Sequence, residues 1–415
     1  MIFQIFRYNV LETELSANSE KQIEKLRAWW WHRQGFAESV QFASPAAVFK
    51  ETGWARSVGG CGPYLTLFSR AGISRGVADS AVANLEIHEL PSARACTYVV
   101  PAADYSLALH LAQNCGPGEM RVAEKLGVTA KEIDKVCQAV VAALAKGPLD
   151  PDEIRKATGG VVRSLGPEGQ KKGLTSTLPV ALGQLQKSAD IRRIPVNGRL
   201  DQQRYQYTLW RPNPLSKEKL TPEQAEAQLA QRFFHWIAPA RLAEFQTFAG
   251  ISLKAAKIAV EPLKLETLSP DDELLLPSSL RAEFEAFKPP KEPCYHFVTT
   301  LDSVLLLRRN LNSLLDPADI ENSFLSPAAS CAGGTLSELP SPAIVDRGRI
   351  VGLWEYDPDS ESIAYVSFVK KNALLKKALA QMEEYVRTQL GDVRTFSLDS
   401  PKSRMPRIAA FRAAK

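Results

Sequence analysis

The stretch "AGISRGVADSAVANLEIHEL" at residues 71–90 decides the fold, because it returns as "AGISLKAAKIAVEPLKLETL" at 249–268. Without a gap, nine of the twenty positions are identical. Counted from the serine, matches fall at +4, +7, +8 and +11, which is one face of an α-helix. Ser74 and Ser252 stand where a helix N-cap belongs, and the preceding glycine supplies a turn from an earlier helix. The repeat therefore predicts helix, tight turn and helix in two places.

The first copy also contains "GISRG" at 72–76, which has the G-x-S-x-G spacing of a hydrolase nucleophile elbow. An elbow serine lies between a strand and a helix, whereas the preceding "YLTLFSRA" is typical of a helix. The second copy has Lys254 in place of the distal glycine. The comparison favours a helix cap over a catalytic serine.

Related patterns lie between the two copies. Residues 126–144 and 172–196 each carry Gly-x-Thr before an apolar helical face. The second stretch continues through an Asn197-Gly198 turn into a strand-like run at 205–210, which predicts a β-hairpin. Candidates for a first helix, with a capping residue and a terminal glycine, are 44–53, 150–159 and, more loosely, 238–250.

Helix, tight turn, helix and two short strands is the order of a winged helix. We predict an α+β fold with three tandem winged-helix units at about 40–115, 145–215 and 220–270, and a helical insert at about 118–146. Strand-rich sequence beyond 270 predicts a small C-terminal β-barrel, followed by a helix at about 370–390. The corresponding domains are predicted at 1–118, 119–215, 216–285 and 286–415.

The net charge of +5 is unevenly distributed along the chain. Residues 1–159 hold 17 basic and 17 acidic side chains, whereas 160–215 hold nine basic and three acidic ones. Residues 400–415 add five basic side chains and no acid. Localised positive charge indicates a polyanionic partner, and an ordinary solvated basic face is the alternative.

Other sequence features exclude several classes of protein. The six cysteines form no C-x-x-C pair, and a packing role is favoured over a metal pair for His110 and Cys115. We predict no metal, no cofactor and no membrane association, because no apolar run approaches the ~20 residues that span a bilayer. Reduced thiols and the lack of a signal-peptide pattern predict a cytoplasmic protein. Three adjacent tryptophans at 29–31 favour helix packing over base stacking.

The segment 171–211 carries the strongest signal for nucleic-acid binding. We expect a helix led by Lys171 and Lys172, followed by a basic hairpin that reaches the phosphates or the minor groove. A scaffold role in protein contacts remains the alternative for these units. The candidate DNA-contacting residues are Arg56, Lys171, Lys172, Lys187, Arg192, Arg193, Arg199, Gln202, Gln203 and Arg204.

Several longer stretches carry a family resemblance. These stretches, in order, are "TGWARSVGGCGPYLTLFSRAGISR", "ELPSARACTYVVPAADY", "PVNGRLDQQRYQYTLWRP", "RFFHWIAPARLAEFQTFAGIS" and "DRGRIVGLWEYD". Over about residues 25–412 the chain resembles the AlkZ/YcaQ-like winged-helix DNA-binding proteins, relatives of bacterial DNA glycosylases that unhook crosslinks and excise alkylated purines. The resemblance implies tandem winged helices and a C-terminal barrel that form a concave surface for duplex DNA.

The resemblance also implies where catalytic residues belong. Active relatives carry Gln-x-Gln or Gln-x-Asp after the first helix of the first unit, to position a water near the sugar. That place is Trp54-Ala55-Arg56-Ser57 here, with Ala55 and Ser57 at the two motif positions, and no Gln, Asp or Glu lies between Thr52 and Asp79. Alanine cannot polarise a water. Arg56 is expected either to bind a phosphate or to pair with a local acid.

The leading hypothesis is therefore a monomeric, duplex-binding protein of the glycosylase superfamily without the usual catalytic motif. An active glycosylase with relocated water-activating residues, such as Glu86 or Asp104, is the second hypothesis. A protein-interaction scaffold is the third.

Overall fold

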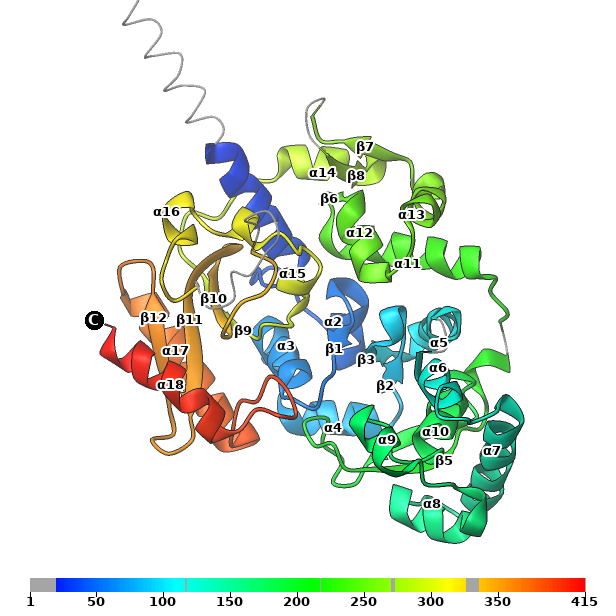
Figure 1. Ribbon diagram of the computed structural model, residues 1–415. Helices are drawn as coiled ribbons and strands as arrows, with labels where there is room; N and C mark the ends of the chain where they lie inside the picture. Colours follow the sequence, from blue (N-terminus) through cyan, green and yellow to red (C-terminus); the bar gives the residue numbers. More distant parts are fainter. Residues whose placement is uncertain (1–19, 116–117, 217, 270–272, 326–335, 415) are drawn as a thin grey trace, which may run out of the picture.

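Helices and small antiparallel sheets make up the part of the chain that the computed structural model describes, residues 20–115, 118–216, 218–269, 273–325 and 336–414 (Figure 1). The α+β class is therefore confirmed. No helix within these ranges is long and apolar enough to cross a membrane.

The sequence repeat is a repeat of topology. The first copy lies in a unit with the elements α2 (Pro45–Thr52), β1 (Ala55–Arg56), α3 (Gly62–Ala71), α4 (Arg75–Ala83), β2 (Ile87–Pro91) and β3 (Thr97–Pro101). The second lies in a unit with α11 (Pro222–Ile237), β6 (Ala240–Arg241), α12 (Leu242–Ala249), α13 (Leu253–Val260), β7 (Leu265–Thr267) and β8 (Leu274–Pro277). Both sheets are antiparallel, and in both the last strand lies in the middle, in the orders β1-β3-β2 and β6-β8-β7.

The predicted caps of both repeats are confirmed. The Oγ of Ser74 accepts a hydrogen bond from the N–H of Val77 at 3.4 Å, and that of Ser252 accepts one from Ala255 at 3.1 Å. Gly72 and Gly250 end the preceding helices in the left-handed region, at φ 61° and 72°, which a side chain would strain. Because a helix, α3, precedes Ser74, this serine lies on no strand-to-helix elbow.

The middle unit differs from its predicted form. Its elements are α7 (Ala130–Leu144), α8 (Pro151–Thr158), α9 (Gly166–Lys171), α10 (Leu178–Lys187), β4 (Ile191–Pro195) and β5 (Tyr205–Leu209). Leu149 pairs with Tyr207 of β5, so α7 precedes the first extended residue and takes the first-helix position. Residues 150–159 were predicted as that first helix, but they follow Leu149 as α8. Similarly, α11 precedes β6 in the third unit, so residues 238–250 form its second helix rather than its first.

The stretch predicted as a helical insert is part of the middle unit's core. Buried side chains of α7, such as Ile133 and Val140, pack with Ile154 of α8 and Leu182 of α10. The lysines expected to lead a helix also lie elsewhere, because Lys171 ends α9 and α10 begins at Leu178. The short helices α5 (Tyr105–Asn114) and α6 (Gly118–Glu124) connect the first unit to this one.

The C-terminal part is a four-stranded sheet with a helix on each face. Its elements are β9 (Tyr295–Val298), β10 (Ala343–Asp346), β11 (Arg349–Asp357), β12 (Ser362–Ser367), α17 (Ala373–Tyr385) and α18 (Pro401–Ala413). Alternate strand residues face opposite cores: Ile344 packs in the cluster of α17, whereas Ala343 and Val345 pack in the cluster of α18. The predicted barrel is not confirmed, because the strand order among the described residues is β12-β11-β10-β9 with no pairing between β9 and β12.

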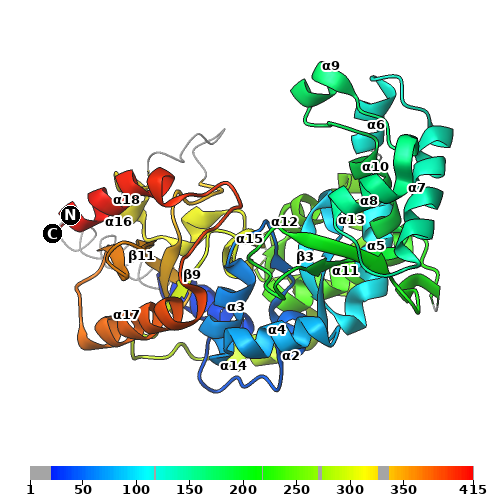
Figure 2. The same cartoon turned by 90° about the horizontal axis from the view of Figure 1, so that it is seen from below.

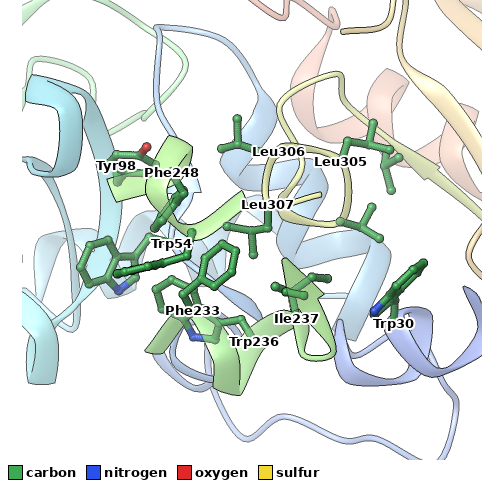
Figure 3. Packing of buried hydrophobic residues seen from close by; sticks show 14 of the residues in the cluster. Trp30, Trp54, Tyr98, Phe233, Trp236, Ile237, Phe248, Leu305, Leu306 and Leu307 are labelled. Carbon is green, nitrogen blue, oxygen red and sulfur yellow. The ribbon is translucent and has the colours of Figure 1, made fainter. Parts of the chain in front are cut away.

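The hydrophobic cores cross the predicted domain boundaries. A helix over residues 20–33 buries its three tryptophans, and Trp29 and Trp30 donate ring hydrogen bonds to the carbonyls of Ala238 and Pro239. The interpretation of these tryptophans as packing residues is confirmed. Figure 3 shows the continuation of this cluster, where Trp54 lies between Tyr98 and Trp236. The short helices α14 (Arg281–Ala286), α15 (Ser303–Leu306) and α16 (Pro317–Ile320) lie between the third unit and the sheet in sequence.

The caps yield a stability prediction. Replacing Ser74 or Ser252 with alanine removes one acceptor from the first turn of α4 or α13, so each change lowers the free energy of unfolding by about 0.5–2 kcal/mol. Urea denaturation followed by circular dichroism measures this cost. Ser80→Ala is the control, because the Ser80 hydroxyl donates to the carbonyl of Gly76 within α4 and caps nothing. Equal stability of the cap variants and the wild type would contradict the cap assignment.

Candidate nucleic-acid interface

Trp54, the first residue of the motif position Trp54–Ser57, has a structural role. Trp54 is 2% exposed and its ring N–H donates to Asp104 Oδ2 at 3.0 Å. Arg232 donates to Asp104 Oδ1 through Nε at 3.1 Å and Nη2 at 2.7 Å. Asp104 is itself buried and both of its oxygens are engaged. Its carboxylate fixes α11 to the first unit and is not available to activate a water, which argues against it as a catalytic candidate.

A buried carboxylate nevertheless lies beside the motif. Ala55 is buried in β1 and pairs with Val99, and Glu89 of β2 pairs with the same residue from the other side. The three side chains therefore share one face of the sheet. Ser57 continues that face, and its hydroxyl donates to Glu89 Oε1 at 2.5 Å. Glu89 thus occupies the place next to the second motif position.

The basic hairpin of the middle unit covers this carboxylate. Arg193 Nη2 lies 3.3 Å from Glu89 Oε2, and its guanidinium lies 4.6 Å from the ring centroid of Tyr205. Burial acts to lower the pKa of Arg193, but the electrostatic effects of Glu89, Tyr205 and Tyr207 together outweigh burial and raise that pKa. Burial and the same carboxylate raise the pKa of Tyr205. Glu89 is therefore a buried carboxylate, 5% exposed, that is paired with Arg193.

The tip of the hairpin is also docked on the first unit. Leu200 is fully buried, and its N–H donates to the Tyr64 hydroxyl at 2.8 Å. Arg199 Nε donates to Asp201 Oδ1 at 2.8 Å, so this arginine is neutralised within the tip. Gln203 is exposed and its Nε2 donates to the carbonyl of Val58 at 3.4 Å, directly after the motif.

Apart from Arg56, which lies in β1, the candidate DNA-contacting residues separate into two groups. Arg193, Arg199, Gln202 and Gln203 gather beside the motif, where Arg193 and Arg199 are paired with acids and Gln202 lines a small cavity of about 350 Å³. The others are more open. Lys172 and Arg204 are exposed, Lys171 forms an exposed ion pair with Glu168, and Lys187 and Arg192 are half-buried. Figure 2 shows α9, which ends at Lys171, far from α3 and α4.

The C-terminal basic segment is largely neutralised. In α18, Arg404 pairs with Asp392 at 2.6 Å, Arg407 with Glu355 at 2.7 Å and Arg412 with Asp357 at 2.6 Å. These arginines fasten α18 to the C-terminal sheet. The count of five basic residues without an acid overestimates the charge that this segment offers to a polyanion.

The remaining candidates have ordinary surroundings. Glu86 is exposed and lines a hollow with Ser74 and Ser44, away from Ser57. His110 contacts the Ser106 carbonyl through Nδ1 and accepts from the Leu220 N–H through Nε2. Within the described ranges, no group of three His, Cys, Asp or Glu side chains could hold a metal ion.

Glu89 is absent from the candidates derived from the sequence. Its strand, "IHEL" at 87–90, places Glu89 on the same face as Ile87, but a glutamate without a visible partner is ordinarily expected to face solvent. Only the pairing of β1 and β2 on either side of β3 brings it to Ser57. The signal that could have found it is Arg193, a charge in the middle of a hairpin strand that requires a counter-ion.

The fold and this site define a class: an α+β protein built from repeated helix-and-sheet units, with a basic hairpin closed over a buried carboxylate. A family model for DNA glycosylase AlkZ-like proteins matches residues 61–390. The chain therefore belongs to this family. The matched range begins after Trp54–Ser57, so it excludes the motif position.

A solved structure shares the fold of this chain. The fold is similar to that of the Streptomyces sahachiroi DNA glycosylase AlkZ, with a TM-score of 0.66, 18% sequence identity, and coverage of 90% of this chain and 98% of that one. No curated protein sequence matches the chain.

The ion pair between Glu89 and Arg193 predicts how firmly the hairpin is held. Glu89→Gln keeps the shape of the side chain but removes its charge, so Arg193 loses its counter-ion. Because the Arg193 side chain is 18% exposed, we expect a loss of stability below the roughly 3–5 kcal/mol of a fully buried pair. Amide exchange in β4 and β5 is expected to accelerate.

The matched control is Glu86→Gln, which changes an exposed glutamate just before the same strand. Mass-spectrometric hydrogen exchange measures both variants. Unchanged exchange over residues 191–209 in Glu89→Gln would show that the ion pair does not hold the hairpin.

Proposed function

We propose that this protein binds duplex DNA as a monomer and does not hydrolyse the glycosidic bond. The observation that supports it best is the state of the motif position. Ala55 offers no polar group, Ser57 is engaged with Glu89, and Glu89 is paired and covered by the hairpin. No side chain at these two positions is free to orient a water towards a sugar.

DNA binding is supported by family membership and by the fold. We further propose that each of the three units is a winged helix, with domains close to 1–118, 119–215, 216–285 and 286–415. In such units the second helix of the turn and the hairpin contact the groove and the phosphates. The exposed side chains of Lys172 and Arg204 are suited to phosphate contacts, because neither has an acidic partner among the described residues.

Binding across a salt series tests this function. Counterion release predicts that log affinity for a duplex falls linearly with log salt, and that Lys172→Gln and Arg204→Gln each reduce the slope by about 0.9. Fluorescence anisotropy with a labelled duplex measures the slopes. The control is Lys376→Gln, an exposed lysine on α17, which is expected to leave the slope unchanged. If the wild type fails to bind at low salt, the scaffold function replaces DNA binding.

A second function is favoured by one observation. Glu89 is a carboxylate within hydrogen-bond reach of the second motif position, and the exposed Gln203 lies just beyond it. If DNA displaced the hairpin, Glu89 could serve as a general base for a water. The protein would then be a glycosylase acting on alkylated or crosslinked purines with relocated groups.

Incubation with an oligonucleotide that contains 7-methylguanine, followed by alkaline cleavage at abasic sites, separates the two functions. The proposed function predicts no cleavage above the protein-free level. The second predicts excision that falls roughly 100-fold or more in Glu89→Gln, the usual contribution of a general base, and that persists in Glu86→Gln. Excision that Glu89→Gln leaves intact would contradict both assignments.

A further inference from the structure

Three arginines from separate segments lie close enough to Tyr98 for their charges to act on it. Arg56 lies in β1, Arg94 in the turn between β2 and β3, and Arg309 three residues beyond the end of α15. The Arg56 guanidinium lies 5.3 Å from the ring centroid of Tyr98, and its Nη1 donates to the Thr97 carbonyl at 3.0 Å. Burial raises the pKa of Tyr98 to about 12, and the positive charges of all three arginines oppose that rise.

These positive charges have almost no compensation. Among the described residues, no carboxylate pairs with Arg56 or Arg94. Arg309 has Glu338 at 3.8 Å, but that glutamate is 78% exposed. The Nε of Arg309 is buried and without a hydrogen-bond partner in the same part of the chain. Burial and the charge of Arg94 lower the pKa of Arg309, so an anion placed between them would relieve both costs.

The backbone holds two of these arginines in unusual conformations. Arg94 has φ 59° and Arg309 has φ 54°, in the left-handed region that non-glycine residues seldom adopt. Such strain is concentrated at ligand-binding sites. Gly250, in the second copy of the repeat, also makes room for Arg94, because a Cβ there would lie 2.5 Å from Arg94 Cγ. The turn of the third unit therefore supports a side chain of the first unit.

We propose that Arg56, Arg94 and Arg309 together bind a phosphate group. Arginine presents a planar fork of N–H donors that matches phosphate oxygens, and the half-buried setting of Arg56 and Arg309 strengthens each bond. If the proposed function holds, this phosphate belongs to the DNA backbone beside the motif position. The alternative source is a free phosphate or phosphorylated small molecule.

The first arm of the test uses inorganic phosphate alone. At matched ionic strength, phosphate is expected to raise the melting temperature of the wild type above its value in chloride, since a ligand that binds the native state stabilises it. Arg94→Gln and Arg309→Gln are expected to lose this shift, and Lys376→Gln to keep it. Arg94 is exposed, so its replacement leaves the core intact. Equal melting temperatures of the wild type in phosphate and chloride would overturn the site.

The second arm measures duplex affinity for the same variants. If the DNA backbone supplies the phosphate, Arg94→Gln and Arg309→Gln each reduce the slope of log affinity against log salt by about 0.9. If the variants lose the phosphate-induced rise in melting temperature but bind the duplex as the wild type does, the ligand is a free phosphate. If phosphate raises the melting temperature only when the arginines are present, and the protein binds no duplex, the phosphate site is supported and the proposed function is rejected.

Discussion

A buried ion pair between Arg70 and Asp302 connects the parts of this molecule. The two side chains are 0% and 1% exposed, and Arg70 Nη2 lies 2.6 Å from Asp302 Oδ1. Arg70 belongs to α3 and also donates to the Gln34 carbonyl at 2.8 Å, while Asp302 caps α15 through the N–H of Val304. Breaking such a pair leaves a charge in a dry interior, which typically costs about 3–5 kcal/mol. The N-terminal helix, the first unit and the C-terminal sheet are thus fixed to one another.

This pair also places the arginines that follow it. α15 begins beside Asp302 and leads to Arg308, whose guanidinium stacks 3.7 Å from the ring centroid of Trp30 and donates to the Pro239 carbonyl. The next residue, Arg309, lies close enough to Tyr98 of the first unit for its charge to act on that side chain. A chain segment held at Asp302 and Arg308 has little freedom between these points. The position of Arg309 therefore follows from the ion pair far more than from local sequence preferences.

The sequence predicted those features whose causes are local. The caps at Ser74 and Ser252 act within three residues, and the pairing of β4 with β5 joins two strand-forming runs that are close in sequence. The assignments were wrong where the position of a segment depends on residues that are far away in the sequence. Residues 150–159 have the sequence of a first helix, but the pairing of Leu149 with Tyr207 gives that role to the preceding helix. The open order of the C-terminal strands, where the sequence predicted a barrel, likewise depends on tertiary contacts.

The count of basic residues was a poor guide to the DNA-binding surface for a related reason. A count does not show which basic side chains are paired with acids in the fold. Arg193, Arg199 and the arginines of α18 increase the basic total, and each is paired with an acid. The cluster near Tyr98, whose one carboxylate partner among the described residues is the exposed Glu338, contains only Arg56 from the sequence-derived candidates. Arg94 and Arg309 lie in stretches of unremarkable composition. Free positive surface is thus a property of the fold.

The segment Trp54–Ser57 and the docked hairpin are one structural unit. Ser57 is 3% exposed, and its hydroxyl already fills the space within hydrogen-bond distance of Glu89. A glutamine at this position would have to displace either Glu89 or the hairpin strand that carries Arg193. Conversely, without the hairpin Glu89 would lose its counter-ion. The serine, the glutamate and the arginine therefore satisfy one another, and restoring a Gln-x-Gln motif by substitution at 55 and 57 alone would disrupt that set before it produced a water site.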